Sequence, residues 1–584
     1  MSTFSTPENT EFYSSNPYTV LNKSQQEIRL IKVLPDDKCG FINCELLPNS
    51  CLAEVRGAYN ALSYCAGNLR KTGVVLVNGV KCNVFANLKH ALVEARHFWR
   101  KRYKDREFLL WVDQLCIDQS NFLERSQQVG IMRDIYQPAE RVIICLSTEK
   151  CSGRGMTWLV KLYDNIPPLE NDLEVREEGS FLKDADRDED SDNQSVSTNG
   201  LTPTRYHAIR LQRYIWDNVL DEDFLNGWLA FYDILECQWW KRAWVFQEFI
   251  TSTQSWFIYG RKSITWANLS PMLASIIRSH YSLLTSRHYF LAFNQGFDLD
   301  GPEDRQLCRV IDRSTRDGCR VALDSVKFIV TSKLKWTGST DLKCLLAHSR
   351  YCESFDDRDR VYVFLGLGDP GYRITPDYHV DNSTTQVLID TTKNIILFED
   401  SLEVLCHAVA SQRDTSRNLP SWVVDWTCPE LGRKRDKHFG GKLSNHISGI
   451  KKMKANCSFY DVYSLKGVRS SMILEVWGFH IDTLRVQIIS NLDSLEDRTL
   501  YSAFETARGH TACTSSLVQC RDQLWILEGA TVPLILRPQE NGYLVISSAL
   551  VMLNKIMDDS ERPVLCLIDL VENGEVHRQQ ISLV

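Results

Sequence analysis

The sequence predicts an α/β protein: a mostly parallel sheet flanked by helices, then a helical region and a small β-rich C-terminal domain. Three observations support this. Between residues 59 and 146, short apolar runs alternate with segments of helical periodicity, an alternation typical of parallel sheets with right-handed crossovers. Helical periodicity dominates residues 261–430. From about residue 471 the apolar segments become short and closely spaced, as in β-structure.

Composition restricts the class of protein. The 584 residues correspond to about three or four domains. The net charge of -7 argues against a large basic surface for nucleic acid. The polar N-terminus has no apolar signal region, and no apolar run is long enough to span a bilayer. We therefore expect a cytoplasmic protein with reduced cysteines, no nucleic-acid partner and no membrane span.

The sequence divides into parts of distinct composition. Between Glu170 and Asp192, eleven acids stand against three bases, which is typical of a solvated, disordered insertion. The predicted parts, in chain order, are a flexible tail (1–27), an α/β domain (28–260) with an acidic disordered insertion (170–204), a mainly helical region (261–430), a basic loop (431–470) and a β-rich C-terminal domain (471–584).

Local signals predict the first elements of the α/β domain. Residues 28–34 and 59–64 form apolar runs of strand length, and the second leads to Gly67, which can adopt a positive φ or allow close approach to the backbone. Asn78-Gly79 lies between two β-rich arms and predicts a hairpin. Asn87 is then expected to cap a helix with apolar residues at helical spacing.

The stretch 108–119, FLLWVDQLCIDQ, is the centre of the predicted sheet. Its apolar run predicts a buried strand that ends at Asp113. Ligands of open α/β sheets bind outside the carboxyl ends of the strands, so Asp113 and Asp118 are expected on that rim. Asp118 or Ser120 is expected to cap the next helix. Cys116 is expected to be a buried thiol rather than a nucleophile, because no histidine stands near it in the sequence.

No metal site is predicted. The most metal-like spacing, His510, Cys513 and Cys520, lacks a fourth ligand.

Three ordered blocks resemble the fungal heterokaryon incompatibility (HET) domain. They are YNALSYCAG at 59–67, the long block at 109–146 and WWKRAWVFQE at 239–248. Segments outside these blocks also resemble longer proteins of this family: 28–34, 356–367, 419–426 and 532–537. The sequence departs from the family at Ala66, where tryptophan is usual, at Asp118, where asparagine is usual, and at 547–560, where glycines are expected.

The resemblance implies a role in fungal non-self recognition and programmed cell death, acting through protein partners or self-association. HET domains are thought to be distant relatives of TIR domains, so the resemblance also implies a TIR-like sheet. ALSY at 61–64 looks like the first-strand box of TIR domains, and Trp244-x-x-x-Glu248 looks like their Trp-Cys-x-x-Glu segment. Some TIR domains cleave NAD with a glutamate of that segment. NAD(P) hydrolysis is therefore one alternative function, with NAD as a substrate rather than a bound cofactor, and a degenerate non-catalytic scaffold is another.

Glu248 is the candidate catalytic residue. Cleavage of a nicotinamide–ribose bond passes through an oxocarbenium-like transition state, which a nearby carboxylate stabilises. The alternative is a structural ion pair with Arg242 or Arg125. Trp240, Trp244 and Glu248 are spaced four residues apart, so they are expected to share one face of a helix.

The other candidate residues are expected near the same rim. The predicted pocket or ligand-binding residues are Ser63, Tyr64, Gly67, Asp113, Arg125 and Trp244. Trp244 could wall a pocket, and Arg125 could meet a phosphate or pair with a carboxylate. For Ser63 and Tyr64, packing and backbone hydrogen bonding are the alternative.

Overall fold

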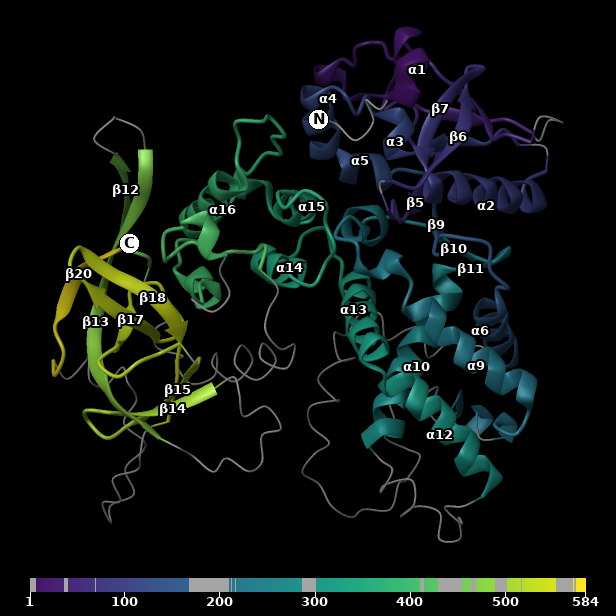
Figure 1. The fold of residues 1–584 in the computed structure, drawn as a ribbon. Helices are drawn as coiled ribbons and strands as arrows, with labels where there is room; N and C mark the ends of the chain where they lie inside the picture. The colour runs from purple at the N-terminus through teal and green to yellow at the C-terminus, as the bar shows by residue number, and fades with distance from the viewer. Residues whose placement is uncertain are drawn as a thin grey trace. The chain divides into compact units, whose positions relative to one another are not determined.

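A computed structural model of the chain describes most of its residues (Figure 1). The described ranges are 7–35, 40–68, 70–104, 106–166, 210–285, 301–409, 414–428, 454–463, 469–488, 501–515, 517–552 and 571–584, except positions 212, 216, 572 and 573. Two compact units are present: Met1–Thr340 with Pro376–Tyr378, and Asp341–Thr375 with His379–Val584.

The first unit is built on a mixed sheet. Its strands are β2 (Ile31–Val33), β3 (Asn43–Leu46), β5 (Asn60–Tyr64), β6 (Thr72–Val77), β7 (Val80–Phe85), β8 (Leu109–Trp111), β9 (Arg141–Cys145), β10 (Ser255–Tyr259) and β11 (Lys262–Thr265). They form a nine-stranded sheet in the order β11-β10-β9-β5-β8-β2-β3-β6-β7. A separate pair joins β1 (Glu27–Ile28) to β4 (Ser50–Cys51).

This sheet is parallel only in part. Strands β10, β9, β5 and β8 run parallel to one another, and all five residues of β5 are buried, as expected for a strand covered on both faces. Around this centre, β2 pairs antiparallel with both β8 and β3, and hairpins add β7 and β11. The prediction of an α/β protein is confirmed. The prediction of a mostly parallel sheet is wrong: β3 also pairs parallel with β6, but short strands and hairpins can pair antiparallel without a helical crossover.

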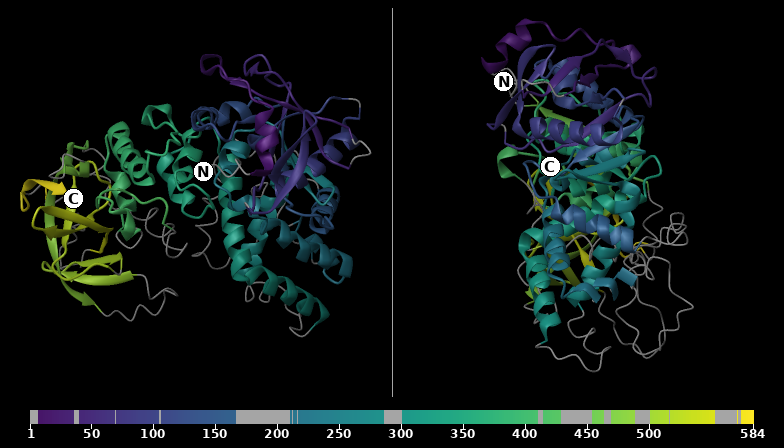
Figure 2. Two further views of the ribbon diagram at one scale, coloured as in Figure 1. Left: turned by 45° about the horizontal axis from the view of Figure 1, so that its top comes forward. Right: turned by 90° about the vertical axis from the view of Figure 1, so that its right-hand side faces the viewer.

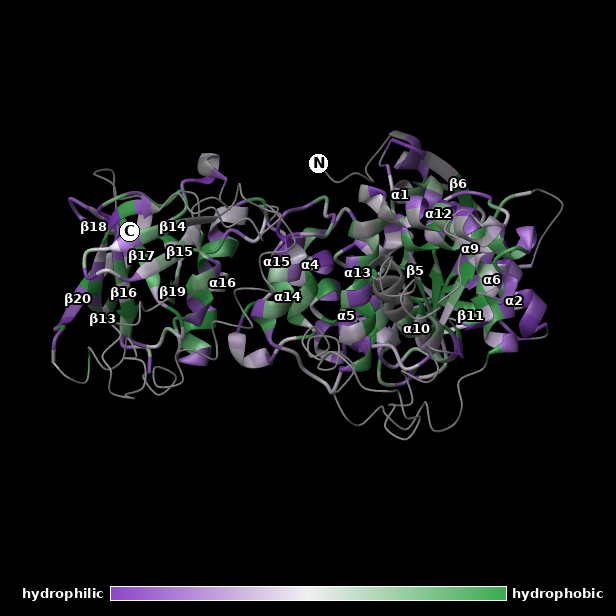
Figure 3. Cartoon of the chain, turned by 90° about the horizontal axis from the view of Figure 1, so that it is seen from below, coloured by the Kyte–Doolittle hydropathy of each residue, from purple (hydrophilic) through white to green (hydrophobic). Residues whose placement is uncertain are grey.

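Helices cover this sheet and extend beyond it (Figures 1 and 2). They are α1 (Thr10–Ser14), α2 (Ala86–Arg102), α3 (Asp113–Cys116), α4 (Phe122–Gly130), α5 (Met132–Tyr136), α6 (Arg154–Asn165), α9 (Glu222–Leu235), α10 (Trp266–Thr285), α12 (Pro302–Thr315) and α13 (Asp317–Leu334). Helix α2 buries the predicted apolar stripe against the sheet, and Figure 3 shows hydrophilic stretches along α2 and hydrophobic residues along β5. No helix in the described ranges has the length and hydrophobicity needed to cross a membrane.

Residues 7–27 pack against the sheet, in contrast to the predicted flexible tail. Phe12 in α1 is buried, and the side chain of Asn9 exchanges hydrogen bonds with the backbone of Asn83 in β7. The hydroxyl of Tyr18 donates to the carbonyl oxygen of Leu115. The segment is polar overall, so its composition predicted a flexible tail. Its few aromatic side chains nevertheless become buried and stabilise its packing against the sheet.

Two turn predictions have different outcomes. The hairpin at Asn78-Gly79 is confirmed: both residues have positive φ and connect β6 to β7. The predicted cap of α4 is wrong, because Asn121, not Asp118 or Ser120, accepts hydrogen bonds from the first backbone N–H groups of the helix. Asp118 instead accepts from the N–H and hydroxyl of Ser120, just before the helix. The predicted cap at Asn87 lies within α2, which begins at Ala86.

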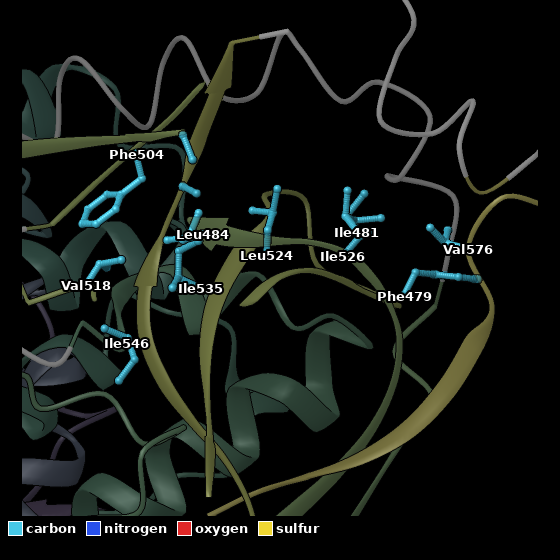
Figure 4. Close-up of a cluster of buried hydrophobic side chains, with 12 residues drawn as sticks. Phe479, Ile481, Leu484, Phe504, Val518, Leu524, Ile526, Ile535, Ile546 and Val576 are labelled. Carbon is cyan, nitrogen blue, oxygen red and sulfur yellow. The ribbon is translucent and has the colours of Figure 1, made fainter. Parts of the chain in front are cut away.

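The second unit contains helices and a C-terminal sheet. The helices are α14 (Leu342–Ser349), α15 (Asp359–Leu365) and α16 (Thr384–Glu399), and the strands are β12 (Cys457–Tyr463), β13 (Arg469–Ile488), β14 (Tyr501–Thr506), β15 (Thr511–Ser515), β16 (Gln523–Leu527), β17 (Leu534–Gln539), β18 (Gly542–Ser548), β19 (Leu550–Met552) and β20 (Arg578–Leu583). Strand β16 pairs with both β17 and β13, so β16, β17, β18, β20 and β13 close into a ring. Buried side chains including Phe479, Leu524 and Ile535 fill this sheet's core (Figure 4).

The division between the units differs from the predicted one. The first unit extends to Thr340, so α10, α12 and α13 belong with the α/β sheet rather than with a separate region that starts at 261. Within the predicted basic loop 431–470, Cys457–Tyr463 forms β12. The predicted acidic insertion 170–204 and residues 429–453 lie outside the described residues.

The close packing of α6 on α9 generates a first prediction. A Cβ atom on Gly155 would lie 2.4 Å from the carbonyl oxygen of Ala230, whereas one on Gly130 would meet nothing closer than 3.9 Å. Gly155→Ala should therefore lower the free energy of unfolding by about 1–3 kcal/mol through overpacking. Gly130→Ala should leave it unchanged or raise it slightly. Urea unfolding of both variants tests this, and equal stability would contradict it.

Candidate functional site

The carboxyl ends of β5 and β8 bring Ser63 and Asp113 to one edge of the sheet. The two strands are parallel, and Ala61 lies opposite Trp111 in the register. Ser63 and Asp113 each follow that pair by two residues, so they lie at the same level. Strand β9 flanks β5 on its other side, with Ser63 opposite Ile144. This edge is the rim at which ligands of α/β sheets bind.

Glu248 reaches this edge as the buried partner of Arg242. Its side chain is 3% exposed, and each of its carboxylate oxygens lies 2.9 Å from a guanidinium nitrogen of Arg242. The hydroxyl of Ser63 also donates to Glu248 Oε2, and Trp239 Nε1 donates to Ser63 Oγ over 2.7 Å. Both oxygens of Glu248 are thus occupied by groups of the protein itself.

The segment that carries these residues is not one continuous α-helix. A 3-10 helix, η5 (Gln238–Lys241), ends at Arg242, which is extended. A π-helical turn, η6 (Phe246–Ile250), follows. The prediction that Trp240, Trp244 and Glu248 share a helix face is therefore wrong. The break has a clear consequence, because the extended Arg242 can place its guanidinium across both oxygens of Glu248.

Lys333 on α13 fixes the far end of this segment. Its Nζ donates to the carbonyl oxygens of Phe249 and Ile250, over 2.9 and 3.0 Å, and also to that of Ser252. Burial lowers the pKa of Lys333 to about 7. The carbonyl groups at the end of η6 thus find their hydrogen-bond donor on another helix rather than in solvent.

Asp113 is the second carboxylate of the cluster. Its Oδ1 accepts hydrogen bonds from the Tyr64 hydroxyl over 3.2 Å and from the Gln114 N–H over 2.7 Å. Within the described part of the chain, Oδ2 accepts no hydrogen bond. Burial and the nearby charge of Glu248 raise the pKa of Asp113, while Arg242 opposes the shift. Burial alone would lower the pKa of Arg242, but the two carboxylates raise it, Glu248 most strongly.

The structure brings some predicted residues together and leaves others apart. Ser63, Tyr64, Asp113 and Glu248 form one cluster with Arg242. The guanidinium of Arg125 instead lies 3.9 Å from the ring centre of Tyr378. The carbonyl of Trp244 accepts from the N–H of Glu248 within the same turn.

Gly67 and Cys116 have structural roles. Gly67 has φ of 76°, and a Cβ there would collide with the side chain of Asn87. Burial raises the pKa of the Cys116 thiol to about 12, and the residue is fully buried. This supports the predicted buried thiol and makes a reactive thiolate unfavourable.

Two residues of the cluster were not predicted. Trp239 holds Ser63, and the hydroxyl of Tyr136 donates to the carbonyl of Leu62. Trp239 lies in the third HET-like block, which was the only sequence signal for it. The only sequence signal for Tyr136 was its place among the apolar residues of the helix predicted after Asp118. That signal does not distinguish it from residues of the core.

The cluster combines charges that can support acid–base chemistry. Arg242 keeps Glu248 in a paired state, whereas Asp113 has a raised pKa and, among the described residues, an oxygen that accepts no hydrogen bond. Two carboxyl groups whose environments differ in this way can act as an acid and a base in catalysis. The same arrangement can also be purely structural, because buried ion-pair networks perturb pKa values as well.

Comparison with known proteins identifies this region. Residues 59–248 match the model of the heterokaryon incompatibility protein (HET) family, so the chain contains a HET domain. The match runs from the first of the three HET-like blocks to the last residue of the third. It ends at Glu248 itself.

A curated relative extends the similarity beyond the domain. Heterokaryon incompatibility protein 6, OR allele, of Neurospora crassa is 24% identical over 411 residues, which cover 63% of this chain and 53% of the relative. The chain thus spans about half the length of that relative. No solved structure matches the chain.

The raised pKa of Asp113 generates a prediction about stability. Below the pKa of about 4 that Asp113 has in the unfolded chain, the carboxyl is protonated in both the folded and the unfolded state. Its ionisation then does not change the free energy of unfolding. As the pH rises through the higher folded pKa, the folded protein must ionise a group that the unfolded chain has already ionised, so stability falls. Asp113→Asn should therefore raise the Tm at pH 7.5 relative to wild type and give a smaller gain near pH 4.5. Thermal unfolding followed by tryptophan fluorescence measures both, and a gain that does not depend on pH would contradict the prediction.

The buried ion pair between Arg242 and Glu248 generates another prediction about stability. Arg242→Met leaves Glu248 buried without its cation and should destabilise the first unit by about 3–5 kcal/mol. The double variant Arg242→Met, Glu248→Gln should recover part of that loss, because it removes the unpaired charge. Chemical unfolding of the wild type and of both variants measures the loss of stability and its recovery. A double variant as unstable as Arg242→Met would show that the ion pair is not the source of the loss.

Proposed function

We propose that this chain is a heterokaryon-incompatibility-type module that signals non-self recognition in fungi and triggers programmed cell death. The observation that carries the proposal is the HET match at residues 59–248. The Neurospora crassa relative named as a heterokaryon incompatibility protein supports it. In this proposal the module acts through protein partners or self-association in the cytoplasm.

The geometry favours signalling by association over constitutive catalysis. Glu248, the candidate catalytic carboxylate, is bound on both oxygens by Arg242 and on one by Ser63. This carboxylate is also buried, so a ribose hydroxyl cannot reach it in the conformation observed. Any chemistry at this edge therefore requires a conformational change, which a partner or a second copy of the chain would supply.

Expression in a fungal host tests the signalling role. The wild-type chain should arrest growth. Gly155→Ala should weaken the arrest because it disrupts the packing of the first unit, and the matched Gly130→Ala should retain it, because position 130 has room for a methyl group. Normal growth with abundant soluble wild-type protein would refute the proposal.

The second candidate function is cleavage of NAD or a related nucleotide, and the gathering of Glu248 and Asp113 at one strand-end rim favours it. In this proposal the first unit is a TIR-like domain. Arg242 must release Glu248 before the carboxylate can hold the ribose and stabilise the developing positive charge. Asp113, with a free oxygen and a raised pKa, would contact the substrate first.

Nicotinamide release from NAD tests this enzyme proposal, and the chain offers a matched control. Glu124 also forms a buried, bidentate ion pair, with Arg29. Glu248→Gln and Glu124→Gln should therefore disturb folding to a similar extent, but only Glu248→Gln should abolish nicotinamide release. Equal release by the wild type and Glu248→Gln, or no release by the wild type under conditions that promote self-association, would exclude catalysis by Glu248.

A further inference from the structure

A dense cluster of cations lies at the C-terminal end of α2, away from the candidate site. We call it the α2 basic patch. Its exposed members are His97, Arg100, Lys101, Arg102, Lys104 and Arg106, with Arg261 from the turn between β10 and β11. This concentration contrasts with the net charge of -7 for the whole chain, so the acidic balance of the sequence conceals a locally positive surface.

Nearby carboxylates neutralise only part of the patch. Glu94 pairs with Arg261, and Glu140 pairs with Arg106 and Arg141. Lys101 and Lys104 have no ion-pair partner among the described residues.

His97 lies among these charges. Burial lowers its pKa first, Arg261 and Lys101 lower it further, and Glu94 acts in the opposite direction.

Helix stabilisation accounts for only some of these cations. Arg100, Lys101 and Arg102 occupy the last turn of α2, where a positive charge interacts favourably with the helix dipole. That interaction falls off within the last turn. Lys104 and Arg106 follow the end of the helix, so the dipole does not explain them.

The chemistry of the patch points to a phosphate-bearing surface. The exposed large hydrophobic side chains of the described residues lie elsewhere, so the patch lacks the apolar anchor that protein interfaces use. The rings of Phe98 and Trp99 are buried, and the guanidinium of Arg102 lies 4.1 Å from the ring centre of Trp256. These occupied rings offer no stacking platform for the bases of single-stranded nucleic acid. The patch can therefore bind a partner through electrostatic attraction to its phosphate groups, without inserting an apolar or aromatic side chain into it.

We propose that the α2 basic patch docks the chain on an anionic lipid surface. Clusters of lysine and arginine bind acidic headgroups through contributions that add over the residues near the surface. Binding of this kind is peripheral, reversible and weakened by salt, because exposed charges are screened. The proposal does not depend on the function proposed for the HET domain.

Vesicle sedimentation of the purified full chain tests the proposal. The probe is phosphatidylcholine vesicles with phosphatidylserine, against phosphatidylcholine alone, at low and high salt. The test variant is the double charge reversal Lys101→Glu, Lys104→Glu. The control, Lys71→Glu, Lys81→Glu, makes the same change in net charge at two exposed positions outside the patch, just before β6 and in β7. Circular dichroism confirms that both variants fold.

The expected result is salt-sensitive binding of the wild type to the phosphatidylserine vesicles only. The test variant should lose affinity by about tenfold or more, while the control should bind like the wild type. Three outcomes would overturn the proposal: equal binding to both kinds of vesicle, equal binding by the test variant and the wild type, or no binding to vesicles. A duplex RNA of matched charge forms a parallel arm, and binding to RNA without binding to vesicles would assign the patch to nucleic acid instead.

Discussion

The buried carboxylate of Glu248 is the constraint on which the candidate site depends. A charge removed from water must be paired and hydrogen-bonded, or it destabilises the fold. Arg242 and Ser63 meet this requirement from two segments that are distant in the sequence. To do so, the chain must leave the helical path at Arg242 and re-form a turn at Phe246. The ion pair thus restrains the conformation of this segment, and the hydrogen bond from Ser63 joins the segment to β5.

Several features of the fold could be predicted because local chemistry determines them. Asn78-Gly79 requires positive φ at both positions, and the hairpin follows from that. Asp113 terminates an apolar run, and the parallel register places it beside Ser63. The break between η5 and η6 could not be predicted, because four-residue spacing looks the same in a continuous helix. The break brings together Arg242 and Glu248, which are six positions apart, and that separation does not match the helical period.

The structure of the N-terminal segment also could not be predicted from local sequence patterns. Its composition is that of a solvated tail, yet Arg29 binds the carbonyl oxygens of Thr19 and Cys116 together with Glu124. One buried guanidinium therefore connects the N-terminal segment, the end of α3 and the start of α4. The backbone N–H of Asp118 completes the arrangement by donating to Glu124 Oε1 over 2.7 Å. The contacts of Arg29 with Cys116 and Glu124 join residues 87 and 95 positions apart, so no local pattern could reveal them.

The two buried arginine–glutamate pairs of the first unit use the same chemistry in different surroundings. Around Arg29 and Glu124, neutral backbone groups supply the remaining hydrogen bonds, and no second carboxylate of the described residues takes part in them. Around Arg242 and Glu248, a third ionisable group, Asp113, interacts with both partners and has a raised pKa. An arginine–glutamate ion pair with no second carboxylate beside it is most stable when the two side chains stay in contact. A pair beside a second carboxylate has an alternative partner for its cation, and Asp113 provides one for Arg242. A change of conformation at this edge of the sheet would therefore involve the Arg242–Glu248 ion pair and Asp113 together, not the glutamate at position 248 alone.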